Sequence, residues 1–119
     1  MTVSLAADRL TTTVRLRGEL DLRAREYLDL AMDPLANAPL AIIDMSRVTY
    51  ADATFLAAVT RLRWARDVRG CTERIHIVGA DRAIAHVCSL VGFDQYLHFV
   101  DPVVAIRKEP LAALALVLR

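Results

Sequence analysis

Thr54 and Asp52 lie at the beginning of a long amphipathic run. Residues 53–69 carry apolar side chains at helical spacing, so Asp52 and Thr54 fall where a predicted helix starts. The first backbone N–H groups of a helix lack partners, and a carboxylate or hydroxyl there can cap them. The same hydroxyl can instead accept a phosphoryl group, whose negative charge suits the helix dipole. From the residues alone, capping and phosphorylation of Thr54 both remain open.

The other residue types that carry chemistry form no recognisable pattern. The four glycines lie at least nine residues apart, so no glycine-rich phosphate loop is present. His76, His86 and His98 are scattered along the chain and predict no zinc site. Two cysteines, Cys71 and Cys88, are too few for a disulfide framework. We therefore predict no catalytic residue, no metal and no cofactor, and a protein that is not an enzyme.

The composition predicts one cytoplasmic domain that covers residues 1–119. Hydrophobic residues make up 55% of the chain, enough for a core without disulfides. The 15 basic residues nearly balance the 14 acidic ones, which argues against a nucleic-acid partner. The N-terminus lacks a secretory leader pattern, and the longest apolar stretch, residues 111–118, is far short of a bilayer span of about 20 residues. No membrane insertion is expected.

Strand-like and helix-like segments alternate along the chain. The patterns predict strands near residues 3–7, 12–18, 41–43, 74–78 and 98–100, and helices over 22–35, 53–69, 82–91 and from 102 onward. The first two strands are close enough for a hairpin, so we expect a mixed, mostly parallel sheet of about four to five strands with about four helices. The first helix is expected to bury Leu22, Tyr27, Leu28, Leu30 and Leu35, and the second Phe55, Leu56, Val59, Leu62 and Ala65.

Three segments, in order along the chain, resemble the STAS domain family of anti-sigma-factor antagonists. Residues 42–56, IIDMSRVTYADATFL, resemble the family's strand ending in Asp, followed by Asp-Ser-Ser-Gly-Leu at the start of a long helix. Residues 16–21, LRGELD, resemble its Gly-Glu-Leu-Asp turn. Residues 78–81, VGAD, through residues 90–93, LVGF, resemble its later strand and helix. The resemblance covers nearly the whole chain and implies a STAS-like α/β fold.

The resemblance also implies a function and a site. In the family the second hydroxyl of the Asp-Ser-Ser pattern accepts a phosphoryl group from an anti-sigma-factor serine/threonine kinase, and that position matches Thr54. The unmodified protein binds the kinase and the phosphoprotein releases it. The implied partner-binding residues are Asp21, Asp52, Ala53, Thr54 and Phe55. Some small STAS proteins instead serve as accessory subunits on the ATPase of a lipid-transport complex, which is the alternative function.

Two residues depart from the family pattern, and two other features leave alternatives open. Ala53 replaces the first serine, and Phe55 replaces the glycine, so the phenylalanine either packs inward or crowds the docking surface. Trp64 lies off the apolar stripe of its helix and is either exposed or covered by a neighbouring helix. The apolar residues 111–118 either pack against the sheet or bury themselves in a second copy as a homodimer.

Overall fold

Five strands form one mixed sheet in the computed structural model, which describes residues 1–100. They lie side by side in chain order: β1 (Thr2–Ala7), β2 (Thr11–Leu20), β3 (Leu40–Ala51), β4 (Ile75–Val78) and β5 (Leu97–Phe99). β1 pairs antiparallel with β2 through a short turn, whereas β2 to β5 are parallel neighbours. The predicted mixed, mostly parallel α/β fold is therefore confirmed.

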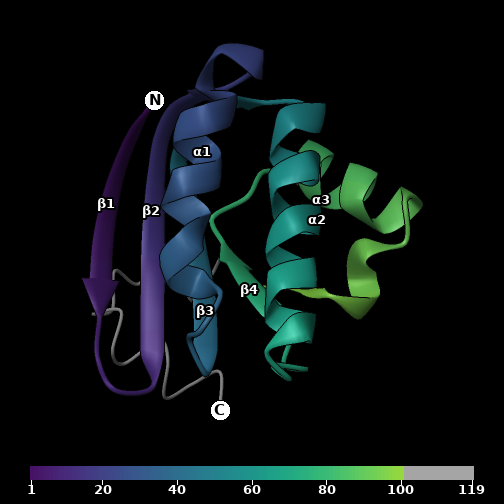
Figure 1. Cartoon of the computed structure of the whole chain (residues 1–119). Helices are drawn as coiled ribbons and strands as arrows, with labels where there is room; N and C mark the ends of the chain where they lie inside the picture. The colour runs from purple at the N-terminus through teal and green to yellow at the C-terminus, as the bar shows by residue number, and fades with distance from the viewer. Residues whose placement is uncertain (101–119) are drawn as a thin grey trace.

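The helices connect the parallel strands and cover one face of the sheet. They are α1 (Arg25–Met32), α2 (Ala53–Val68) and α3 (Arg82–Leu90), with short 3₁₀ turns η1 (Leu22–Ala24), η2 (Asp33–Leu35) and η3 (Phe93–Gln95). Each crossover advances to the next strand in the same direction, and because such crossovers are right-handed the helices share a face (Figure 1). No helix within residues 1–100 is long and apolar enough to cross a membrane.

The fourth predicted helix, from residue 102 onward, lies outside the described residues. The apolar residues 111–118, and the homodimer that could form through them, also lie outside the described part of the chain. Within residues 1–100 the helix count is three, one fewer than expected.

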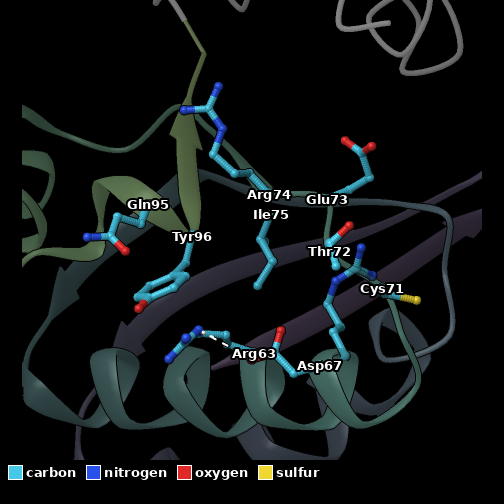
Figure 2. Close-up of a pocket in the computed structure, with 10 residues that line it drawn as sticks. Arg63, Asp67, Cys71, Thr72, Glu73, Arg74, Ile75, Gln95 and Tyr96 are labelled. Carbon is cyan, nitrogen blue, oxygen red and sulfur yellow. Dashed lines mark ion pairs between the residues drawn. The ribbon is translucent and has the colours of Figure 1, made fainter.

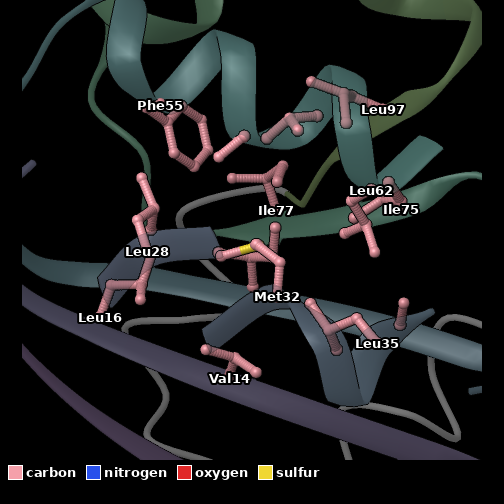
Figure 3. Packing of buried hydrophobic residues seen from close by; sticks show 14 of the residues in the cluster. Val14, Leu16, Leu28, Met32, Leu35, Phe55, Leu62, Ile75, Ile77 and Leu97 are labelled. Carbon is pink, nitrogen blue, oxygen red and sulfur yellow. The ribbon is translucent and has the colours of Figure 1, made fainter. Parts of the chain in front are cut away.

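The core lies between the helices and the sheet. Phe55, Val59 and Leu62 of α2 are buried, and Leu56 and Ala65 pack against the same cluster, so the predicted stripe of this helix is confirmed. Figure 3 shows Phe55 and Leu62 of α2 in the same cluster as labelled residues of β2, α1, β4 and β5. Trp64 is 68% exposed, so of its two alternatives the structure shows the exposed one. The inward-packing alternative for Phe55 also holds, since its side chain is 1% exposed.

The first helix differs from its prediction in length and in what it buries. Only residues 25–32 are α-helical, and 3₁₀ turns replace both predicted ends. Leu28 and Leu35 are buried as expected, but Leu22, Tyr27 and Leu30 are exposed. Leu28 and Met32, four residues apart, face the sheet, which turns Tyr27 and Leu30 outward. The prediction failed for these three because an apolar side chain was taken as evidence of burial, and single apolar residues are common on protein surfaces.

The third strand is much longer than the predicted residues 41–43. Only Ile42, Ile43 and Asp44 pair with β4, while the strand continues to Ala51 along β2. The register between β2 and β3 shifts after Asp44, where β3 carries an extra residue. The Asp44 carboxylate accepts hydrogen bonds from the Ser46 N–H at 2.9 Å and the Ser46 hydroxyl at 2.6 Å. This bulge interrupts the alternation that sequence patterns rely on.

Candidate functional site

An aspartate follows each of the strands β2, β3 and β4 and caps the next helical segment. The Asp21 carboxylate accepts from the Arg23 N–H at 3.0 Å, that of Asp52 from the Thr54 N–H at 2.8 Å, and that of Asp81 from the Ile84 N–H at 2.9 Å. Since parallel strands end at one edge of the sheet, the three capped starts lie along the same edge. In open α/β sheets this carboxyl edge is where ligands and partners usually bind.

Thr54 occupies the first turn of α2 and is partly exposed. Asp52, rather than Thr54, is the N-cap of this helix, so the threonine hydroxyl is not needed for capping. The Thr54 hydroxyl makes no side-chain hydrogen bond to another residue within 1–100. The sequence left capping and phosphorylation open as roles for Thr54. The structure assigns the cap to Asp52, which leaves the Thr54 hydroxyl without a capping role.

A groove of about 410 Å³ lies beside Thr54, between the starts of α2 and α3. Asp52, Ala53 and Phe55 line it from one side, and Asp81 stands on the other. Tyr50, at 52% exposure, and Val87 present apolar surface at its rim. The remaining lining residues are Thr49, Ala51, Leu56, Ala83 and Ile84. The groove is therefore an apolar hollow with one carboxylate on each wall.

The structure brings most of the predicted site residues together, but not all of them. Asp52, Ala53 and Phe55 share the groove, and Thr54 lies next to it. Phe55 is buried, so it shapes the groove from beneath. Asp21 lines a different hollow beside the start of α1, with Glu19, Arg23 and Tyr27. Whether these residues bind a partner stays a prediction.

Asp21 belongs to a small charged network. The Arg23 guanidinium donates to the carboxylates of Asp21, at 2.7 Å, and Glu19, at 3.1 Å. These side-chain hydrogen bonds hold the pKa of Asp21 below its usual value, while Asp21 in turn raises the pKa of Arg23. The carboxylate of Asp21 is thus already engaged by a neighbour, unlike an acid poised to take a proton.

Sequence reasoning missed the apolar residues that complete the groove. Tyr50, Ile84 and Val87 come from the end of β3 and from α3, which are far apart in the chain. The spacing of Ile84 and Val87, three residues apart on a predicted helix, was the available signal. The part of the chain that the structure describes holds no group of three or more His, Cys, Asp or Glu side chains that could bind a metal ion.

Replacing Asp52 with alanine is expected to destabilise the protein by about 1 kcal/mol, the usual cost of losing a helix cap. The Thr54 N–H would lose the acceptor that now lies 2.8 Å away. Asp52→Asn keeps a capping oxygen and should stay near the wild-type stability. Urea denaturation of both variants checks this, and equal losses in the two would mean that the charge rather than the cap stabilises α2.

Comparison with known proteins now identifies the family. The family model described as "Mlab, STAS domain" matches residues 3–104. The structure of the anti-sigma factor antagonist SpoIIAA in its unphosphorylated form is 18% identical with a TM-score of 0.64, covering 90% of this chain and 96% of that one. The phosphorylated form of the Bacillus cell fate determinant SpoIIAA is also 18% identical, with a TM-score of 0.65 and coverage of 90% and 98%.

A third solved structure agrees. A putative anti-sigma factor antagonist from Thermotoga maritima is 13% identical with a TM-score of 0.69, covering 89% of this chain and 92% of that one. No curated protein matches the chain. At such identities the solved structures show a shared fold, and the family match spans most of the sequence. The chain therefore belongs to the STAS domain family.

Proposed function

We propose that this protein is a cytoplasmic anti-sigma-factor antagonist that binds a serine/threonine kinase of the anti-sigma type and releases it when Thr54 is phosphorylated. One observation carries the proposal: Thr54, a partly exposed residue whose hydroxyl is not used as a cap, lies in the first turn of α2, between two residues that line an apolar groove. The family match and the SpoIIAA-like fold support it. The protein itself acts as a binding module, and the phosphoryl transfer is carried out by the partner with ATP.

Phosphorylation would act on the contact surface rather than on the fold. A phosphoryl group adds about −1.5 to −2 charges at neutral pH. The start of α2 tolerates an anion because of the helix dipole, so the helix should remain folded. Asp52 and Asp81 already place two carboxylates on the groove. A partner packed on the apolar rim would have to bury a dianion beside them, which costs several kcal/mol.

Thr54→Glu is expected to abolish partner binding while the melting temperature stays near wild type. Thr60→Glu is the matched control, because Thr60 is an exposed threonine of the same helix, and its hydroxyl donates to the carbonyl of Leu56. Affinity for the candidate kinase is measured by calorimetry for both variants. The proposal is wrong if Thr54→Glu binds as tightly as the control.

The modification is tested directly by mass. Incubation with the kinase and ATP should add one phosphoryl group to the wild type and none to Thr54→Val. Peptide mapping places the group. Addition at another residue, with Thr54 unmodified, would contradict the proposed switch even if binding is observed.

A second function is favoured by the two departures from the family pattern. Ala53 and the buried Phe55 replace the serine and glycine of the pattern, and a module that binds without being phosphorylated needs neither. In this alternative the protein is an accessory subunit on the ATPase of a lipid-transport complex. It predicts stable co-purification with that ATPase and no mass change with ATP, which separates it from the first proposal.

A further inference from the structure

The C-terminal half of α2 carries a buried guanidinium with incomplete hydrogen bonding. Arg66 is 1% exposed, and its Nη1 donates to the carbonyl oxygens of Leu35 and Ala38, both at 2.7 Å. Its Nε and Nη2 have no hydrogen-bond partner. Buried donors are almost always paired, because an unmet donor of a charged group is strongly unfavourable. The position of Arg66 therefore indicates a missing acceptor.

Arg63, almost one turn earlier, repeats this pattern. Its guanidinium carbon lies 3.4 Å from the centre of the Tyr96 ring, and its Nε is buried without a hydrogen-bond partner. The Asp67 carboxylate lies 3.6 Å from that Nε, which is too long for a hydrogen bond. Within residues 1–100, three of the four buried unpartnered side-chain atoms belong to Arg63 and Arg66, and all three are N–H donors.

Both arginines line one small cavity of about 30 Å³. Figure 2 shows Arg63 beneath Tyr96, with Thr72 and Ile75 among the other lining residues, while the guanidinium of Arg74 extends away from Arg63 toward the outside. The rim residues Thr72, Glu73, Arg74 and Gln95 are exposed, so the cavity opens at the surface. A single water needs about 10–15 Å³ by this measure, so the space admits a species of a few heavy atoms.

The net charge of the lining residues indicates the charge of the ligand that this cavity can bind. The lining residues include three arginines, Arg63, Arg66 and Arg74, and two acidic residues, Asp67 and Glu73, which leaves one net positive charge. The unpaired groups are donors only, so the occupant must accept hydrogen bonds. Burial also lowers the pKa of Arg66, and a nearby anion would offset that effect.

We propose that this cavity, here named the α2 C-terminal cavity, binds a small carboxylate that accepts hydrogen bonds from Arg63 and Arg66 while Arg74 contributes charge at the rim. The site lies at the opposite end of α2 from Thr54 and is independent of the proposed switch. A planar carboxylate fits guanidinium donors in pairs, which a spherical ion cannot do.

Formate, the smallest carboxylate, is the probe. Sodium formate is expected to raise the melting temperature in a saturable way, whereas sodium chloride at the same ionic strength, whose spherical anion cannot accept from guanidinium donors in pairs, should not. A blocked aspartate, N-acetyl-aspartate amide, forms a second arm. If it also stabilises the protein, a carboxylate carried by a protein chain can enter; if formate alone does, the ligand is a free small anion.

Cys71 is one of the lining residues and is the partly exposed one of the two cysteines, so its reactivity can report whether the anion is bound. Formate at about ten times its dissociation constant should slow N-ethylmaleimide modification of Cys71 about tenfold if the bound form is unreactive. Cys88 is fully buried and serves as an internal measure that the protein stays folded.

Two charge-matched variants locate the effect. Arg74→Gln removes an exposed cation that lines the cavity, whereas Arg69→Gln removes an exposed cation from the same end of α2 that does not. In Arg69→Gln, formate should raise the melting temperature and slow Cys71 modification as much as in the wild type. In Arg74→Gln, both effects should be much smaller. An equal rise in melting temperature with formate and with chloride, an unchanged Cys71 rate, or equal responses in the two variants would each overturn the proposal and leave a cavity that holds only water.

Discussion

Replacing Gly79 with alanine is expected to destabilise the protein by at least about 3 kcal/mol. Gly79 follows β4 with φ of +73°, a backbone conformation that costs an L-residue about 1–2 kcal/mol. An added Cβ would also lie 2.8 Å from the backbone N and Cα of Ser46. Those atoms belong to the β3 bulge and cannot rotate away as a flexible side chain could, so the two strands would have to separate.

Gly70→Ala is the matched control for this prediction. Gly70 has nearly the same φ, +77°, but an added Cβ would meet nothing within 4 Å. Gly70→Ala should therefore be destabilised only by the cost of the positive φ, about 1–2 kcal/mol. Urea denaturation followed by circular dichroism gives both values. Equal losses in the two variants would show that the contact with Ser46 is unimportant. Because Gly79 leads into Asp81 and α3, Gly79→Ala should also disturb the far wall of the groove.

Acidification from pH 7 to 4 is expected to remove up to about 3 kcal/mol of stability through His76 alone. Burial lowers the pKa of His76 from 6.5 to about 4, helped by the positive charges of His98, Arg74 and Arg66. Its Nδ1 lies 3.0 Å from the Nδ1 of His98, so one ring donates and the other accepts. The unfolded chain takes up its proton near pH 6.5 and the folded protein only near pH 4. The contribution of His76 to the free energy of unfolding is therefore fully present above pH 7 and is lost as the pH falls from about 6.5 to about 4.

Denaturation at several pH values between 7.5 and 4 measures this dependence. Carboxylates also change the free energy of unfolding at acidic pH. The informative quantity is therefore the difference in unfolding free energy between the wild type and His76→Gln, because the variant should depend less on pH. His86→Gln is the control, since His86 is exposed on α3. A wild-type slope that persists in His76→Gln would assign the dependence to other groups.

The elements that the sequence predicted well are those with a clear period and clear ends. The apolar stripe of α2, with Asp52 before it and Gly70 after it, predicted the helix within about one residue. The closely spaced first two strands and the later alternation of strands and helices predicted a sheet that begins with a hairpin and is otherwise mostly parallel. In the candidate site, Asp52 and Thr54 were found because helix starts have a local chemical signature.

Contacts between distant segments could not be predicted from one sequence. His76 and His98 were interpreted as scattered, yet β4 and β5 place them directly opposite each other. Nothing in the sequence around Arg66 marks it as buried, yet its guanidinium donates to the carbonyl oxygens of Leu35 in η2 and of Ala38. In both cases the partner lies more than 20 residues away, and only the pairing of strands or the packing of helices decides which residues meet.

The exposure of the Trp64 indole determines which spectroscopic signal can be used to measure unfolding of this protein. It is the only tryptophan in the chain and already contacts solvent, so its emission should change little when the protein unfolds. Intrinsic fluorescence would then understate denaturation. The emission of the exposed indole should instead shift to shorter wavelength when another molecule covers the outer face of α2. Trp64 fluorescence therefore gives a label-free way to test whether a partner binds there.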